Sequence, residues 1–255
     1  MRFAFAGQTH VGLKRTVNQD AFLLLPEEGL FCVADGLGGH ASGEVAARVA
    51  VEEMAEFFRL TGRDADATWP FAEERTLGPA ENRFLASIRV ANLRVRERAA
   101  ADDRLRGMGT TVVGAFFTGA GRELLVAHVG DSRAYLFRKG TLTRLTEDHS
   151  LLNDVLRLKA LTPEEVAAFP HKNVIVRALG MRDTVEADLR RLELQEGDVI
   201  LLCCDGLSGM VAEAQMAETI RAGRTDLRRT AQALVDAANA AGGLDNVTCV
   251  LAQQL

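Results

Sequence analysis

The sequence predicts an α+β fold in which strands and helices are segregated along the chain. Short apolar runs rich in Val, Leu, Phe and Ala recur over residues 20–35, 110–140 and 198–253. Apolar side chains at helical spacing occupy separate segments, without the regular strand–helix alternation of a doubly wound parallel sheet. These two observations favour sheets built mainly from neighbouring strands, with helices packed outside them.

The strands are predicted from short apolar runs that are bounded by turn-forming residues. They cover residues 20–26, 30–35, 110–118, 123–131, 133–140, 198–205 and 247–253. The segment FRKGTLTRL (137–145) predicts a hairpin with Gly140 in its turn.

Three longer helices are predicted from apolar residues that recur every three or four positions. The first follows Ser42, the second starts at Pro79, and the third starts at Thr225 and stops before Gly242. Residues 61–80 are rich in Gly, Asp, Thr and Pro, which predicts a loop.

The whole chain, residues 1–255, is predicted to form a single catalytic domain with a small helical insertion, which we call the flap (148–180). The flap is the least strand-like part of the middle of the chain. Within it, Thr162 suits a helix N-cap and Pro163 suits the first helical position.

The composition indicates an ordinary globular protein. Of the 255 residues, 47% are hydrophobic and 25% are charged, and the formal net charge is −5, which favours neither nucleic acid nor an anionic membrane as a partner. No apolar run approaches the roughly 20 residues of a membrane span, and the N-terminus is too polar for a signal peptide. We therefore expect a cytoplasmic monomer.

The cysteines are expected to be reduced and buried. They lie in apolar runs without metal-binding C-x-x-C spacing: Cys32, Cys203, Cys204 and Cys249.

Five aspartates stand at the ends of predicted strands: Asp20, Asp35, Asp131, Asp205 and Asp245. Taken singly, Asp-Gly and Asp-Asn pairs are typical of turns. Together at one sheet edge, however, the carboxylates would raise one another's pKa unless a cation lay among them. Mg²⁺ or Mn²⁺ suits carboxylate, carbonyl and water ligands, and Gly36 would leave its carbonyl accessible to such an ion.

Six short motifs follow one another along the chain: R-x-x-N-Q-D (15–20), A-D-G-L-G-G-H (34–40), M-G-T-T (108–111), H-V-G-D-S-R (128–133), C-D-G-L-S (204–208) and D-N-V-T (245–248). In this order they resemble the metal-dependent PPM, or type 2C, serine/threonine protein phosphatases, and their short bacterial branch in particular. The resemblance covers residues 7–250. It implies two packed antiparallel sheets flanked by helix pairs, an α-β-β-α sandwich.

The resemblance also implies a metal-binding role for five residues. Asp35 would bridge two metal ions, Mn²⁺ or Mg²⁺, beside the Gly36 carbonyl. Asp205 and Asp245 would supply the other ligands of that pair. Asp131, together with Asp205, would hold a third metal next to the flap.

Three further residues complete the implied site. Arg15 would bind the substrate phosphate, because a guanidinium can hold two phosphate oxygens at once. Asp20 would accept a hydrogen bond from metal-bound water. Asn246 would support the site without touching the metals.

Two positions depart from common family patterns. Gln19 replaces a frequent glutamate, which removes a negative charge near the site. Leu37 replaces a histidine proposed as the general acid in eukaryotic members. His40 is then either a structural residue before the helix that follows Ser42 or the acid itself, and metal-bound water is the other candidate.

The implied reaction is hydrolysis of phosphoserine and phosphothreonine in proteins by direct attack of a metal-bridging hydroxide. Phosphorylated proteins and a serine/threonine kinase would be the partners. The alternative from another class is a catalytically weak pseudophosphatase that binds phosphoproteins or a kinase. Retention of the repelling carboxylates argues against it. A regulator acting on a sigma-factor antagonist would share the fold and reaction, but it usually accompanies sensory domains.

Overall fold

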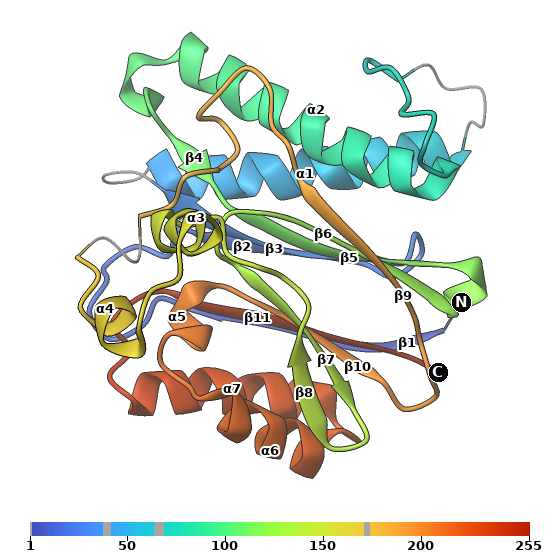
Figure 1. Cartoon of the computed structure of the whole chain (residues 1–255). Helices are drawn as coiled ribbons and strands as arrows, with labels where there is room; N and C mark the ends of the chain where they lie inside the picture. Colours follow the sequence, from blue (N-terminus) through green and yellow to red (C-terminus); the bar gives the residue numbers. More distant parts are fainter. Residues whose placement is uncertain (1, 38–41, 64–68, 171–173) are drawn as a thin grey trace.

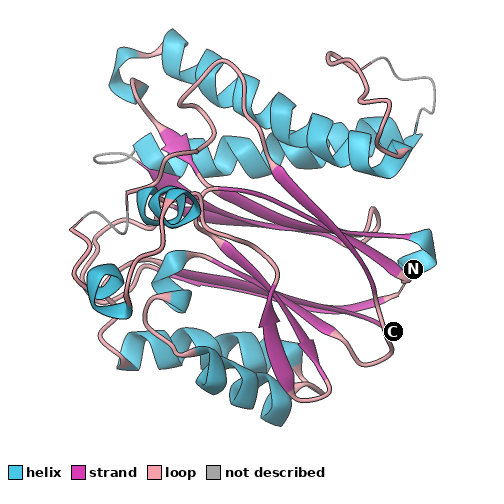
Figure 2. Cartoon of the chain, in the orientation of Figure 1, coloured by secondary structure: helices cyan, strands magenta, loops and turns pink. Residues whose placement is uncertain are grey.

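The computed structural model describes residues 2–37, 42–63, 69–170 and 174–255. Two antiparallel sheets pack face to face, and a pair of long helices covers each outer face (Figure 1; Figure 2). The predicted α-β-β-α sandwich is confirmed.

The first sheet has five strands in the order β1-β11-β10-β7-β8. Their bounds are Phe3–His10 (β1), Val247–Gln254 (β11), Val199–Cys203 (β10), Arg133–Arg138 (β7) and Thr141–Arg144 (β8). The predicted hairpin joins β7 to β8. Lys139 and Gly140 form its turn with φ of 51° and 87°, as a tight hairpin with right-handed twist requires.

The second sheet follows the order β2-β3-β5-β6-β9, and the short β4 pairs with β3. Its strands are Asp20–Leu25 (β2), Leu30–Leu37 (β3), Gly109–Thr110 (β4), Val112–Thr118 (β5), Glu123–Val129 (β6) and Asp188–Glu193 (β9).

The helices form the outer layers. Ser42–Arg63 (α1) and Pro79–Ala101 (α2) cover the second sheet, whereas Glu213–Gly223 (α6) and Leu227–Ala240 (α7) cover the first (Figure 1). The short elements are Asp103–Leu105 (η1), Gly119–Gly121 (η2), Leu151–Leu158 (α3), Pro163–Ala167 (α4) and Asp205–Ser208 (α5). Helices α3 and α4 lie in the flap. No helix within the described ranges has both the length and the apolarity to cross a membrane.

Strand β3 shows why the central strands are apolar throughout. Leu30 and Cys32 pack against α1 and α2, whereas Phe31 and Val33 pack between the two sheets. Burial of both faces removes the alternation of polar and apolar residues that marks a half-exposed strand. Cys32 and the other three cysteines are buried free thiols, as predicted.

Several elements differ from the sequence prediction. Strands β1 and β9 were not predicted, because both are edge strands whose mixed composition hides the pattern. Helix α6 was not predicted either, because only two of its residues, Met216 and Ile220, are buried, which leaves a weak apolar pattern. The predicted loop 61–80 is wrong at residues 61–63, which belong to α1, and at residues 79–80, which belong to α2, and residues 64–68 of it lie outside the described residues. The third predicted helix starts at Leu227 rather than Thr225, with the side chain of Asp226 as its N-cap.

Candidate metal centre

The five strand-end aspartates converge on one end of the sandwich. Asp20 and Asp35 are direct partners in the register of β2 and β3. Asp131 follows β6, Asp205 is the first residue of α5, and Asp245 lies two residues before β11. Repulsion from each of the other four carboxylates contributes to raising the pKa of Asp35.

Burial and repulsion between carboxylates disfavour the ionised form of four of these aspartates, Asp20, Asp35, Asp131 and Asp205. Burial, with help from the neighbouring aspartates, holds the pKa of Asp35 well above its usual range. It raises the pKa of Asp20 to about 6 and that of Asp131 to about 7. Burial of its carboxyl group raises the pKa of Asp205 as well, and repulsion from Asp245 adds to this.

Two carboxylate oxygens support the fit of this site to a divalent cation. Among the described residues, Asp20 Oδ1 and Asp131 Oδ1 are buried side-chain oxygens that accept no hydrogen bond. A buried acceptor without a donor is costly, and crowded carboxylates repel one another. A hard cation with oxygen ligands would relieve both penalties.

The backbone of Asp35 is fixed by the M-G-T-T segment. Its N–H donates to Thr111 Oγ1 at 3.1 Å, and its carbonyl oxygen accepts from Thr111 N–H and Thr110 Oγ1, both at 2.8 Å. Thr111 Oγ1 also lies 2.7 Å from Ser132 Oγ, next to Asp131. The two threonines therefore set the position of one carboxylate and contact the turn that carries another.

Gly36 is required for a reason that the sequence did not show. A Cβ at this position would lie 2.2 Å from the carbonyl oxygen of Gly43 and 2.6 Å from that of Gln19. The Gly36 N–H donates to the Gln19 carbonyl oxygen at 3.1 Å. Gly36 thus allows the first turn of α1 and the Gln19 backbone to approach β3 closely.

Asp20 is held by a chain of hydroxyl groups. Its Oδ2 accepts from Thr248 Oγ1 at 2.6 Å, and Thr9 Oγ1 lies 2.6 Å from the same hydroxyl. Cys204 approaches Asp20 and Asp35, with candidate ligand atoms within 4.8 Å of one another. Burial raises the pKa of the Cys204 thiol well above its usual range, so it forms part of the wall as a neutral thiol.

The predicted phosphate-binding residue lies at the mouth of this cluster. Arg15 Nη2 is 2.7 Å from Asp245 Oδ2, and the two side chains are 55% and 39% exposed. This hydrogen bond is the main cause of the raised pKa of Arg15, and Asp205 and Asp35 contribute. An exposed ion pair is worth roughly 0–1 kcal/mol, so an incoming anion can compete with Asp245 for the guanidinium.

Asn246 holds the loop that carries Arg15. Its side-chain Nδ2 donates to the carbonyl oxygens of Val11 and Val17, at 2.9 and 3.0 Å, and its Oδ1 accepts from Gln19 N–H at 2.8 Å. The amide therefore fixes both ends of that loop beside the metal centre.

The structure brings together every predicted site residue that it describes. His40 lies outside the described residues, so its role stays a prediction. Sequence reasoning assigned no role to Thr111, Thr248 or Cys204, which hold or border the carboxylates. The first two occur in the M-G-T-T and D-N-V-T motifs, which were the available signal.

The model of the protein phosphatase 2C family matches residues 6–252. The chain belongs to this family. It is 36% identical to the serine/threonine phosphatase stp of Listeria innocua over 228 residues, which cover 89% of this chain and 85% of that protein. It is 33% identical to the protein phosphatase PhpP of Streptococcus pneumoniae, over 95% and 94% of the two chains.

Solved structures agree with this protein phosphatase 2C assignment. The serine/threonine phosphatase PstP/Ppp of Mycobacterium tuberculosis superposes with a TM-score of 0.83 at 33% identity, over 98% of each chain. The PstP catalytic domain in complex with two manganese ions gives a TM-score of 0.80 at 32% identity, over 98% of this chain and 97% of that one.

Proposed function

We propose that this chain, a metal-dependent serine/threonine protein phosphatase, hydrolyses phosphoserine and phosphothreonine in proteins at the cluster of five aspartates. The convergence of these carboxylates, with two buried oxygens that lack hydrogen-bond donors among the described residues, is the observation that carries the proposal. Such a cluster suits divalent cations far better than it suits an uncharged ligand.

The aspartates divide into a core set and an outer ligand. Asp35, Asp205, Asp245 and the Gly36 carbonyl would hold two core ions, Mn²⁺ or Mg²⁺, and the manganese-bound PstP structure supports this number. Asp131 would hold a third ion together with Asp205. When bound, such ions lower the pKa of coordinated water and offset the charge of a phosphoryl group.

Arg15 and Asp20 act on the substrate side of the centre. The guanidinium of Arg15 would leave Asp245 and bind two phosphoryl oxygens, which orients the phosphorus toward the attacking water. Asp20, held by Thr248, would accept a hydrogen bond from that water through its buried Oδ1. Both residues orient the reactants, and neither needs to form a covalent intermediate.

The physiological partners would be phosphorylated proteins and the serine/threonine kinase that modifies them. A reducing compartment suits four buried free thiols, so we propose a cytoplasmic location.

A phosphatase assay with and without metal tests this function. Chelator-treated protein should be inactive on p-nitrophenyl phosphate and on a phosphothreonine peptide, and Mn²⁺ should restore turnover more strongly than Mg²⁺. Asp35→Asn should abolish turnover, whereas Asp236→Asn, an exposed change on α7, should leave it unchanged. Full activity in excess chelator would refute metal dependence. Metal binding without turnover would instead support the pseudophosphatase alternative.

A further inference from the structure

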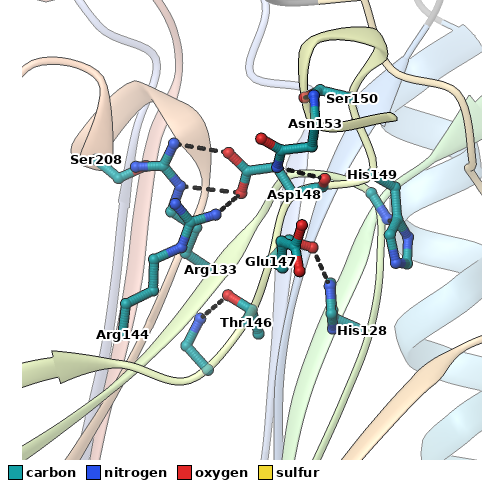
Figure 3. Close-up of polar contacts among 12 residues, drawn as sticks. His128, Arg133, Arg144, Thr146, Glu147, Asp148, His149, Ser150, Asn153 and Ser208 are labelled. Carbon is teal, nitrogen blue, oxygen red and sulfur yellow. Dashed lines mark hydrogen bonds and ion pairs between the residues drawn. The ribbon is translucent and has the colours of Figure 1, made fainter. Parts of the chain in front are cut away.

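The turn that carries Asp131 is held from both sides by two successive residues at the start of the flap. His149 holds Gly130, the residue before Asp131. Asp148 holds Arg133, two positions after Asp131 (Figure 3). Asp131 itself is fixed by neither contact.

His149 binds both backbone groups of Gly130. The His149 ring accepts a hydrogen bond from the Gly130 N–H through Nδ1 at 3.1 Å, and the backbone N–H of His149 donates to the Gly130 carbonyl oxygen at 2.9 Å. Gly130 has φ of +108°, and a Cβ there would lie 2.6 Å from Thr111 Cγ2. Because Gly130 directly precedes Asp131, this double contact determines the direction in which the chain enters the Asp131 turn.

Asp148 fixes the other side of the turn. Its Oδ1 and Oδ2 accept from Arg133 Nε at 3.1 Å and Nη2 at 2.7 Å, a bidentate pair, and Arg144 contacts the same carboxylate (Figure 3). The Asp148 side chain is only 13% exposed, so this pair is shielded from solvent better than most surface ion pairs.

The environment of His149 keeps its ring neutral and correctly oriented. Its Nε2 lies 3.2 Å from Asp188 Oδ1, which also accepts from Arg177 Nη1 at 3.0 Å. The ring stacks on His128 with centroids 4.5 Å apart. Burial lowers the pKa of His149 to about 4. The neutral tautomer with the proton on Nε2 satisfies both Asp188 and the Gly130 N–H.

The cluster is poorly arranged to bind a metal, although His128, His149 and Asp188 have candidate ligand atoms within 4.8 Å of one another. Two imidazoles that share a metal direct their in-plane lone pairs at one point, whereas these rings are stacked at 21° to each other. Binding through His149 Nε2 would also require its proton to move to Nδ1, which already accepts the Gly130 N–H.

The same two residues anchor the flap. The Asn153 side chain donates to the Asp148 carbonyl oxygen at 2.8 Å, and Val176 N–H donates to the His149 carbonyl oxygen at 2.9 Å. Ser150 caps α3 by accepting from Asn153 N–H. The base of the flap and the Asp131 turn therefore share their supports.

We propose that His149 is a positioning residue for Asp131. By accepting from the Gly130 N–H, Nδ1 of His149 fixes the backbone of Gly130. The fixed backbone directs the Asp131 carboxylate to the outer metal position. The inference rests on the proposed role of Asp131 as a metal ligand. Loss of the acceptor should loosen the turn and weaken the third metal while leaving the two core metals bound.

Two substitutions of His149 separate positioning from packing. His149→Asn retains an acceptor near Nδ1, and His149→Gln places its amide near Nε2 without one. A hydrogen bond worth about 1.4 kcal/mol corresponds to about tenfold. We therefore expect about tenfold faster amide hydrogen exchange at Gly130 and Asp131 in metal-free His149→Gln. We also expect about tenfold weaker binding of the weakest Mn²⁺ in calorimetric titration.

The conservative variant and two controls complete the experiment. His149→Asn should stay within about threefold of the wild-type protein in both measurements. Asp188→Asn keeps an oxygen that can accept from His149 Nε2–H, so the ring stays oriented toward Gly130, and this variant should also stay within about threefold. Glu147→Gln, whose exposed side chain pairs with Arg157, should change nothing. Thermal unfolding of each variant checks that it is folded.

Equal effects of the Asn and Gln variants, or wild-type exchange at Gly130 in His149→Gln, would overturn the proposal. If His149→Gln does not fold, His149→Asn and Asp188→Asn still test it, because tenfold faster exchange in either would contradict the assigned role of Nδ1. If instead the proposed metal-binding role of Asp131 is wrong, Asp131→Asn should leave Mn²⁺ binding unchanged. Hydrogen exchange in the metal-free His149 variants would still report on the contact between His149 and Gly130.

Discussion

Replacing Asp131 by asparagine should stabilise the metal-free protein, by an amount that decreases as the pH falls. The folded protein holds the Asp131 proton more tightly than the unfolded chain does, because burial and the Asp205 charge raise the pKa from 3.8 to about 7. The ionised form of Asp131 therefore lowers the free energy of unfolding, and this penalty reaches its full size above pH 7. This penalty shrinks between pH 7 and pH 4, where the folded protein takes up the proton.

The magnitude follows from the same pKa. A tenfold change in proton affinity corresponds to about 1.4 kcal/mol, so a fully shielded Asp131 would destabilise the fold by about 4 kcal/mol once ionised. Part of the side chain contacts solvent and water screens its charge, so we expect about 2 kcal/mol at pH 8. At pH 5 the difference should fall below about 1 kcal/mol. For a chain of this length, 2 kcal/mol raises Tm by roughly 4–8 °C.

Thermal and urea unfolding in excess chelator at pH 8, 6.5 and 5 would measure this difference. Comparing the variant with the wild-type protein cancels the opposing titration of His128 and His149, whose pKa values burial lowers. Asp236→Asn serves as the control. Added Mn²⁺ should stabilise the wild-type protein more than the Asp131 variant. A variant that is less stable at pH 8, or a difference that does not change with pH, would refute the reasoning.

Two further substitutions test the substrate side and the packing of the centre. Arg15→Ala should raise KM for a phosphopeptide at least tenfold, about 1.4 kcal/mol, without changing Mn²⁺ binding. Lys14→Ala, the control, should change neither. A loss of metal affinity in Arg15→Ala equal to that in Asp35→Asn would contradict the assignment of Arg15. Gly36→Ala should destabilise the protein by about 2–3 kcal/mol in urea unfolding, because its Cβ would overlap the Gly43 carbonyl oxygen. Gly78 has φ of −74° and only the end of a side chain nearby, so Gly78→Ala should lower the free energy of unfolding by less than about 1 kcal/mol. A similar loss of stability in both variants would argue against the close approach of α1 to Gly36.

The sequence was sufficient where local chemistry carries the signal. Strands buried on both faces, such as β3 and β10, are continuous apolar runs that end near an aspartate. One such aspartate is typical of a turn, but several of them at one sheet edge indicate a cation. Strands β1 and β9 carry weaker signals because edge strands face solvent and accept polar residues. The order of the six motifs indicated the family, and the fold and the comparisons with known proteins then confirmed it.

The tertiary structure alone decided which groups hold the site in place. Thr248 reaches Asp20 from a position 228 residues away, and Asn246 binds the ends of a loop at the opposite terminus. His149 touches Gly130 only because the chain returns from β8 past the end of β6. The type of a residue shows what its side chain can bind, and its position at the end of a strand shows where several carboxylates can meet. Hydrogen-bond partners distant in sequence depend on how the two sheets stack, and that follows from packing of the whole chain rather than from any local pattern.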